Sequence, residues 1–343
     1  MKVTIKDVAK AAGVSPSTVS RALQGSPRIS PEVRARVREI AQEMNFHPNQ
    51  MARSLVSRQT RIIGIVFPDE AGMNLGNPFY PAVLQGMGHV ASEKGYQMLL
   101  ITGGPGMTAT QSGHAAANGG YVSGLVLLAA EVEPPRQTDV PMVVIGHPVD
   151  AEGRYCVDNA NVQLGYEAAR FLLDNGHERI LLFGYDARFM FTVDRREGYE
   201  KALREAGLEV RKDWIVSSRP IHYPEEGAPL VKLFQQPDRP TAVVCMDDTM
   251  AIALSRLLAS VGLKVPQDVS LISFNNTESS RYHTPPLTTF DVEPYHLGVS
   301  AMTLMIDVIT GERKQPVSIN VPYTLIRRQS VAMIGPPISK KEN

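Results

Sequence analysis

Residues 4–23, TIKDVAKAAGVSPSTVSRAL, contain two short helical patterns on either side of their single glycine. In the first pattern apolar side chains recur at helical spacing, and Thr4 followed by Asp7 is typical of a capping box at a helix N-terminus. Ser15 can cap the second helix, where Pro16 takes the first position, which needs no N–H donor. The stretch therefore predicts a helix-turn-helix whose second helix enters a DNA major groove.

The residues that follow complete a small helical domain. Ser30 starts a third helical pattern, whose apolar positions continue to Met44, and Pro48 marks its end. Three helices in about 45 residues form a bundle with a very small core, which can only just be stable alone. We therefore expect an all-α headpiece over residues 1–47.

A short linker follows the headpiece. In residues 49–58, NQMARSLVSR, Asn49 can cap a short helix that places Ala52 and Leu55 on one face. A helix of this length is marginal by itself, so we expect it to be ordered only when it docks on another surface. The sequence thus predicts a hinge helix and linker over residues 48–61.

From Ile62 the pattern changes to an alternation of strands and helices. The run IIGIVFP at 62–68 is continuously apolar, which is typical of a buried parallel strand. Further strands are expected at 97–102, 124–129, 142–146, 156–159, 179–184, 242–247 and 269–274, and helices at 78–94, 161–175, 194–206, 248–261 and 294–310. The alternation occurs twice, which predicts an α/β body of two doubly wound parallel-sheet lobes with a ligand crevice between them.

The chain is expected to pass more than once between these lobes. Lobe one is expected to span about 62–160 plus about 291–320, lobe two about 161–290 plus about 321–330, and a polar tail 331–343.

The net charge of the chain is zero, but the charges are unevenly distributed. Residues 1–61 hold eleven Lys and Arg and four Asp and Glu, a net charge of +7, and the remaining residues carry −7. A basic headpiece on an acidic body is typical of a DNA-binding module joined to a sensor or an enzyme domain.

The composition argues against several other classes of protein. No apolar run reaches 18 residues and no apolar signal segment is present, so we expect a cytoplasmic protein, with no membrane partner, rather than an exported binding protein. Cys156 and Cys245 suit a reducing compartment and lack metal-ligand spacing, with a disulfide between them as the alternative. The glycine-rich loop 103–106 lacks the lysine of a phosphate-binding loop, so no cofactor and no enzymatic activity are expected.

Several motifs of this chain together resemble those of the LacI/GalR family of bacterial repressors. In the headpiece and linker they are Asp7-Val8-Ala9, Ala12-Gly13-Val14-Ser15, Thr18-Val19-Ser20-Arg21 and Asn49…Ala52…Leu55. In the body they include Asn77-Pro78-Phe79-Tyr80, Asp158-Asn159, Arg195 with Gly198-Tyr199, Asp247-Asp248 and Pro285-Pro286-Leu287-Thr288-Thr289. The resemblance covers the chain from Thr4 to about Ser330. It implies a homodimer on double-stranded operator DNA, with a body of the type I periplasmic-binding-protein-like fold.

The resemblance also assigns the DNA contacts. Arg21 on the second helix can donate two hydrogen bonds to a guanine edge, worth roughly 1–3 kcal/mol of base discrimination, and a surface ion pair is the alternative. Pro16 and Ser17 occupy positions that vary with operator sequence, although a helix-start proline without DNA contact is the alternative for Pro16. The expected DNA-binding residues are Thr4, Ser15, Pro16, Ser17, Thr18, Ser20, Arg21, Asn49, Ala52 and Leu55.

Leu55 is an apolar residue in a polar and basic linker. By the resemblance it is a wedge that enters the minor groove at a central base step and kinks the DNA, whereas packing against the body is the alternative. The neighbouring Arg53, Arg58 and Arg61 favour the wedge, because the linker offers little other apolar surface.

The body is expected to bind a small sugar, which needs hydrogen-bonding side chains and an aromatic face. By the resemblance the effector-binding residues are Phe79, Tyr80, Asp158, Arg195, Trp214, Asp247 and Asn275. Most family members have Asn at the position of Asp247 and Asp at the position of Asn275, so the donors and acceptors are exchanged here. For Trp214, packing inside the protein is the alternative to stacking on a sugar.

These features predict a repressor of sugar-utilisation genes that a small sugar releases from its operator. Ser273-Phe274-Asn275-Asn276 and the segment 291–295 resemble maltose-operon repressors, which favours maltose or a maltodextrin. One alternative is a catabolite-control regulator that a phosphorylated carrier protein corepresses. A sugar- or nucleotide-using enzyme with an attached DNA-binding domain is disfavoured, because no catalytic motif is recognisable.

Overall fold

The computed structural model describes residues 3–23, 25–46, 60–68, 76–129, 138–148, 153–185, 187–217 and 227–338. The chain forms two compact units, Met1–Thr60 and Arg61–Asn343, which we call the headpiece unit and the body. Nearly all of the linker predicted at 48–61, including Asn49, Ala52 and Leu55, lies outside the described residues.

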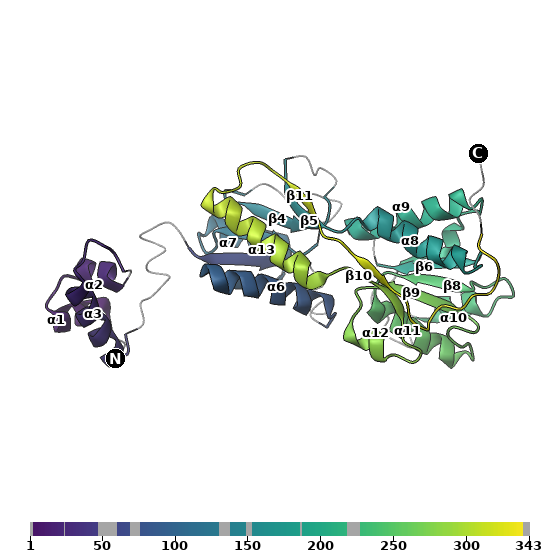
Figure 1. Ribbon diagram of the computed structural model, residues 1–343, viewed down its shortest axis with the longest axis horizontal. Helices are drawn as coiled ribbons and strands as arrows, with labels where there is room; N and C mark the ends of the chain where they lie inside the picture. Colours follow the sequence, from purple (N-terminus) through teal and green to yellow (C-terminus); the bar gives the residue numbers. More distant parts are fainter. Residues whose placement is uncertain are drawn as a thin grey trace. The chain divides into compact units, whose positions relative to one another are not determined.

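The headpiece contains the three predicted helices, α1 (Ile5–Ala12), α2 (Pro16–Leu23) and α3 (Pro31–Glu43) (Figure 1). The backbone N–H of Thr4 donates to Asp7 Oδ2 at 2.8 Å, which completes the start of α1. Gly13 ends this helix with a φ of +64°, a conformation that glycine adopts at little cost. One valine from each helix is fully buried in the shared core: Val8, Val19 and Val37. The helix-turn-helix prediction is confirmed.

Lobe one of the body is a six-stranded parallel sheet with helices on both faces (Figure 1). Its strands, in spatial order, are β11 (Ser318–Asn320), β5 (Tyr155–Asp158), β4 (Met142–Ile145), β3 (Gly124–Leu127), β1 (Ile62–Val66) and β2 (Gln97–Ile101). Its helices are α6 (Phe79–Lys94), α7 (Ala109–Asn118) and α13 (Pro294–Thr310). Helices α6 and α13 share one hydrophobic cluster with the sheet, and α7 packs in another.

Lobe two repeats this topology. Its sheet has the order β12 (Thr324–Ile326), β10 (Thr288–Asp291), β9 (Ser270–Phe274), β8 (Ala242–Cys245), β6 (Ile180–Gly184) and β7 (Ile215–Ser217). Only β12 is antiparallel to its neighbour. The helices are α8 (Asn161–Asp174), α9 (Met190–Glu205), the 3-10 helix η1 (Lys212–Trp214), α10 (Ala228–Phe234), α11 (Asp248–Ser260) and α12 (Glu278–Tyr282). The prediction of two doubly wound parallel-sheet lobes is confirmed.

Three short segments connect the lobes: 159–160, 292–293 and 321–323. The side chain of Asn159 in the first segment reaches the other two. Its Nδ2 donates to the carbonyl of Val292 at 3.2 Å and to that of Val321 at 2.9 Å. Asn159 is buried, so these bonds are shielded from water and hold the three connections together.

The two cysteines lie in different sheets, Cys156 in β5 and Cys245 in β8. Both are buried, and no disulfide joins them. Among the described residues, no helix combines the length and apolar character needed to cross a membrane.

Each lobe contains a pair of helices whose backbones touch through glycines. A Cβ at Gly165 on α8 would lie 2.0 Å from Arg195 O, and one at Gly198 on α9 would lie 1.9 Å from Val162 O. Gly86 on α6 and Gly298 on α13 likewise lie against the backbone of the other helix. No other residue type permits this approach, so these positions fix the helix packing in both lobes.

Gly198→Ala is expected to lower the free energy of unfolding of the body by about 1–3 kcal/mol or more. The new methyl group overlaps the backbone carbonyl of Val162, which cannot move without the rest of α8. Urea unfolding followed by circular dichroism measures the change. Gly88→Ala on α6 is the matched control, since its Cβ would lie 3.4 Å from the flexible end of Met98. Equal stability of the two variants would contradict the packing argument.

Candidate functional site

The predicted DNA-reading helix, α2, has one buried and one exposed face. Val19 and Ala22 are buried, whereas Pro16, Ser17 and Arg21 are exposed. The exposed face of α2 thus carries a proline ring, a hydroxyl group and a guanidinium group. These are the side chains that the sequence predicts to contact the edges of the DNA bases.

Hydroxyl groups gather at the start of α2. Ser15 Oγ accepts a hydrogen bond from the Thr18 backbone N–H at 3.1 Å and lies 2.8 Å from Ser17 Oγ and 2.9 Å from Thr18 Oγ1. This cluster caps the helix, where the exposed N–H groups and the helix dipole favour an anion such as a phosphate. Thr4, at the N-terminus of α1, is exposed as well.

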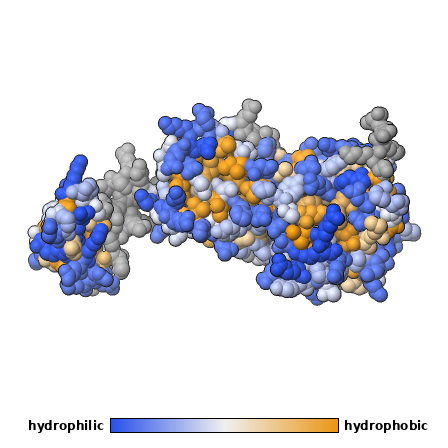
Figure 2. Space-filling view, in the orientation of Figure 1, coloured by the Kyte–Doolittle hydropathy of each residue, from blue (hydrophilic) through white to orange (hydrophobic). Residues whose placement is uncertain are grey.

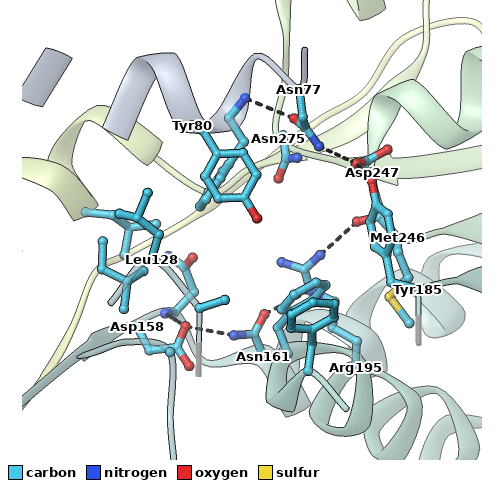
Figure 3. Close-up of a pocket in the computed structure, with 18 residues that line it drawn as sticks. Asn77, Tyr80, Leu128, Asp158, Asn161, Tyr185, Arg195, Met246, Asp247 and Asn275 are labelled. Atoms are coloured by element: carbon cyan, nitrogen blue, oxygen red, sulfur yellow. Dashed lines mark hydrogen bonds between the residues drawn. The ribbon is translucent and has the colours of Figure 1, made fainter. Parts of the chain in front are cut away.

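A cavity of about 90 Å³ lies between the two lobes of the body (Figure 3). Its walls come from the carboxyl ends of strands in both sheets, with β3, β4 and β5 on one side and β6, β8 and β9 on the other. This is where doubly wound sheets bind ligands. Six of the residues predicted at the effector site line it, from both lobes: Phe79, Tyr80, Asp158, Arg195, Asp247 and Asn275.

Arg195 projects from α9 into this cavity and is only 6% exposed. Its Nε donates to Asn161 Oδ1 at 2.8 Å and its Nη1 to the Met246 carbonyl at 2.9 Å. The guanidinium also stacks over the Phe274 ring, 4.1 Å from its centroid. Burial lowers the pKa of Arg195 to about 10, so the side chain remains a fixed cation at neutral pH.

Asp247 lies on the same, lobe-two side of the cavity as Arg195 and is almost fully buried. Its Oδ1 accepts the Met250 N–H at 2.7 Å, which caps α11. Its Oδ2 accepts a short hydrogen bond from Tyr185 Oη and one of 2.7 Å from Asn77 Nδ2 (Figure 3). Asn77 lies just before α6, so this last bond joins lobe one to lobe two. Burial raises the pKa of Asp247.

Asp158 ends β5 at the lobe-one side of the cavity. Its Oδ1 accepts the Asn159 backbone N–H at 2.8 Å and Asn161 Nδ2 at 2.9 Å. Burial raises the pKa of Asp158 to about 7 and that of the nearby Asp194 to about 6. Asp158 therefore changes its charge near neutral pH.

Asn275 is the last of the predicted effector-binding residues that line the cavity. It directly follows β9 and has a φ of +99°. Such a backbone conformation is uncommon outside glycine, and asparagine tolerates it better than most residues.

The structure does not bring Trp214 to this cavity. Trp214 ends η1 beside the edge strand β7, is 5% exposed, and packs under the guanidinium of Arg211 at 4.2 Å. Trp214 therefore does not line this cavity, and its surroundings are those of the packing alternative. The aromatic walls come instead from Tyr185, Phe189 and Phe191, besides the predicted Phe79 and Tyr80.

Asn77, Asn161 and Tyr185 also line the cavity, although the sequence did not predict them there. Asn77 stands in a motif already noted, and Tyr185 directly follows a strand whose carboxyl end faces the crevice. The complete set places acids, amides, a cation and aromatic rings around a small space, which suits a neutral ring that carries hydroxyl groups. The described residues contain no group of His, Cys, Asp and Glu that could hold a metal ion.

Comparison with known proteins agrees with this architecture. Residues 4–49 match the family model "Bacterial regulatory proteins, lacI family", and residues 169–331 match that of a "Periplasmic binding protein-like domain". Over 322 residues the chain is 34% identical to the HTH-type transcriptional regulator MalR of Streptococcus pneumoniae, covering 91% of this chain and 94% of that protein. Over 334 residues it is 31% identical to the HTH-type transcriptional regulator CelR of Thermobifida fusca, covering 95% and 98%.

A solved structure, "transcriptional regulator CelR-cellobiose complex", matches with a TM-score of 0.72 and 28% identity, over 96% of this chain and all of that one. The chain belongs to the LacI family of bacterial regulatory proteins. It is a DNA-binding transcription regulator, and the relatives named here are regulators rather than enzymes.

Proposed function

We propose that the protein represses sugar-utilisation genes and that a small neutral sugar, bound in the cavity between the lobes, releases it from its operator. The observation that carries this proposal is the cavity itself, where Arg195, Asp247 and Asp158 surround a space flanked by aromatic rings. Maltose or a maltodextrin is the favoured effector, since a MalR protein is among the relatives and the chain resembles maltose-operon repressors. A repressor acts where its operator lies, so the proposal implies a cytoplasmic protein.

The size of the cavity supports an effector that changes the angle between the lobes. At about 90 Å³ it is much smaller than the few hundred Å³ of a typical small-molecule site. The Asn77–Asp247 bond joins its two sides, and Phe79 packs against the hydrophobic clusters of both lobes. A sugar that takes Asp247 as its acceptor must compete with Asn77, so binding and lobe movement are coupled.

Exposed apolar residues support a homodimer. Leu99 and Leu100 on the edge strand β2 are 40% and 49% exposed, and Tyr282 on α12 is 71% exposed. Figure 2 shows hydrophobic residues gathered on the visible face of both lobes. Apolar patches of this kind mark interaction surfaces. In a dimer, a second copy covers them and two headpieces contact a pseudo-palindromic operator, where the hinge residues Asn49, Ala52 and Leu55 are proposed to enter the minor groove.

The experiment that tests the proposal first identifies the operator sequence. Duplexes bound by the full-length protein are selected from a random library, and mobility shifts with the selected operator are repeated with maltose, maltotriose, glucose and galactose. Release by one of these sugars is the expected result. Selective DNA binding that no sugar alters would overturn the proposal that a sugar releases the protein from its operator. Tighter binding with a phosphorylated carrier protein would favour corepression instead.

Effector binding should depend on pH through Asp158. Its pKa is raised to about 7 by burial, and the ionised carboxylate is the stronger acceptor for a sugar hydroxyl. If only the ionised form binds, affinity at pH 6 is about tenfold weaker than at pH 8. Calorimetric titration with the releasing sugar measures this.

Two variants isolate the responsible group. Asp158→Asn should flatten the pH profile. Asp194→Asn should keep the pH dependence but move its midpoint to lower pH, because the charge of Asp194 helps to raise the pKa of Asp158. An unchanged slope in Asp158→Asn would show that another group titrates.

A further inference from the structure

Asn161 joins two charged residues of the cavity between the lobes. Its Oδ1 accepts a hydrogen bond from Arg195 Nε at 2.8 Å, and its Nδ2 donates to Asp158 Oδ1 at 2.9 Å (Figure 3). The residue is only 4% exposed, so both bonds are shielded from water. The Arg195 guanidinium acts on the Asp158 carboxylate through its charge, and the amide of Asn161 takes the place of a direct ion pair between them.

The position of Asn161 follows from the packing of two helices. It is the first residue of α8, directly after the connection 159–160, and its backbone N–H donates to the Asn159 carbonyl at 2.8 Å. Gly165 lies one turn further along α8, and a Cβ there would lie 2.0 Å from Arg195 O. The close approach of α8 and α9 at this glycine therefore sets the amide of Asn161 beside the guanidinium.

The two bonds of Asn161 require a side chain of a particular kind. A guanidinium only donates hydrogen bonds and an ionised carboxylate only accepts them, so the residue between them needs both an acceptor and a donor. In Asn161 the oxygen faces the cation of Arg195 and the nitrogen faces the acid of Asp158. In this orientation the amide dipole stabilises both charges.

The separation of the two charges keeps them available to a ligand. Opposite charges attract strongly in a buried site, and a direct ion pair would occupy the donors of the guanidinium and the acceptors of the carboxylate. Arg195 instead uses Nε and Nη1 for bonds to Asn161 and Met246. Figure 3 shows its guanidinium and the hydroxyl of Tyr80 directed into the open centre of the cavity.

We propose that Asn161 is a positioning residue of the effector site, which holds Arg195 and Asp158 apart so that one sugar can bond to both. This inference rests on the proposed function, because it concerns the residues at which the sugar is proposed to bind. Asn161 acts through its two neighbours. Loss of its amide should therefore weaken effector binding even though both charged side chains remain.

The titration of Asp158 in the full-length protein, without sugar, tests the positioning directly. Aspartate labelled at its side-chain carboxyl carbon gives NMR signals that follow each ionisation, and Asp158→Asn identifies the signal of Asp158. Burial raises the pKa of Asp158 to about 7, and the bond from Asn161 opposes this rise. The charged groups that act on Asp158 from α9 are Arg195, which lowers its pKa, and Asp194, which raises it. Both are retained in the variants below.

Two variants separate the bonds of Asn161 from its volume. Asn161→Leu removes both bonds and keeps most of the volume, so the Asp158 midpoint should rise and less than half of this carboxyl group should be ionised at pH 7. Asn161→Ala also removes the spacer, so the guanidinium can approach the carboxylate and the midpoint should lie below that of Asn161→Leu. The matched control is Gln163→Leu, which removes an exposed amide that bonds Glu167 on the same helix and should leave the midpoint near 7.

Calorimetric titration with maltose at pH 8 then measures the effect on the effector site. Both Asn161 variants should bind maltose about 10- to 100-fold more weakly than wild type, the loss expected when hydrogen bonds to charged groups are broken, and Gln163→Leu should bind it normally. Thermal unfolding checks the fold of each variant, and Asn161→Ala serves where Asn161→Leu does not fold.

A wild-type Asp158 midpoint in both Asn161 variants, or a maltose affinity that neither variant alters, would overturn the positioning role. Failure of the proposed function gives a different result. In that case no sugar binds the wild-type protein, whereas the Asp158 midpoint still responds to the loss of the Asn161 amide.

Discussion

Arg195→Lys is expected to abolish sugar-induced release of the operator while operator binding persists. Lysine keeps the charge but cannot donate to Asn161 Oδ1 and the Met246 carbonyl at once, and it loses the stacking on Phe274. At least one buried acceptor then lacks a partner, which costs about 1–3 kcal/mol. We expect effector affinity to fall about 100-fold, equivalent to about 2.8 kcal/mol.

Sugar titration and operator mobility shifts measure the two activities separately. Arg256→Lys is the matched control, since Arg256 is exposed on α11 and does not line the cavity. Operator release by sugar at wild-type concentrations in Arg195→Lys would refute the role of Arg195 in effector binding. Loss of DNA binding together with a collapse of the folded body would instead assign Arg195 a structural role.

Arg21→Ala is expected to remove most of the sequence preference of the headpiece. The exposed guanidinium on α2 is the side chain best suited to a bidentate contact with guanine, which contributes about 1–3 kcal/mol. The affinity for the selected operator should therefore fall about 5- to 150-fold, with a much smaller loss on random duplex. Competition mobility shifts with both DNAs measure the specificity ratio, which is the affinity for the operator divided by the affinity for random duplex.

Arg28→Ala removes the same charge from an exposed position outside α2 and controls for electrostatics. It should weaken binding to both DNAs equally and reduce its salt dependence. A specificity ratio for Arg21→Ala equal to that for Arg28→Ala would leave only a phosphate contact for Arg21.

The parts of the fold that the sequence predicts best are those set by local chemistry. Thr4, Asp7 and Gly13 define both ends of α1 through caps that involve only neighbouring residues. The strands of the body were recognisable because a parallel strand buried on both faces is apolar throughout, as Ile62–Val66 is.

Elements that depend on distant contacts were harder to place. Helix α9 begins at Met190 rather than at residue 194, because its first turn has no side-chain cap and is held instead by packing. Met190 belongs to a hydrophobic cluster with residues of lobe one, which no local pattern reveals. Short elements such as α10 and β7 likewise lack a sequence signal of their own.

The residues of the candidate site also differ in how well the sequence predicts them. Residues at or just beyond the ends of strands, such as Asp158 and Asp247, could be expected at the crevice because doubly wound topology puts strand ends there. Trp214 could not be excluded beforehand, because a large aromatic residue suits a binding wall and a protein core equally well. Only the position of η1 at the sheet edge separates the two roles.

The buried amide of Asn159 has a mechanical consequence. Because it bonds Val292 and Val321, the three connections between the lobes meet at one point and cannot bend independently. The cavity adjoins this point, since Asn159 also lines it. Rotation about such a fulcrum displaces each atom in proportion to its distance from it, so a shift too small to break a hydrogen bond at the sugar becomes a larger displacement at the far ends of both lobes.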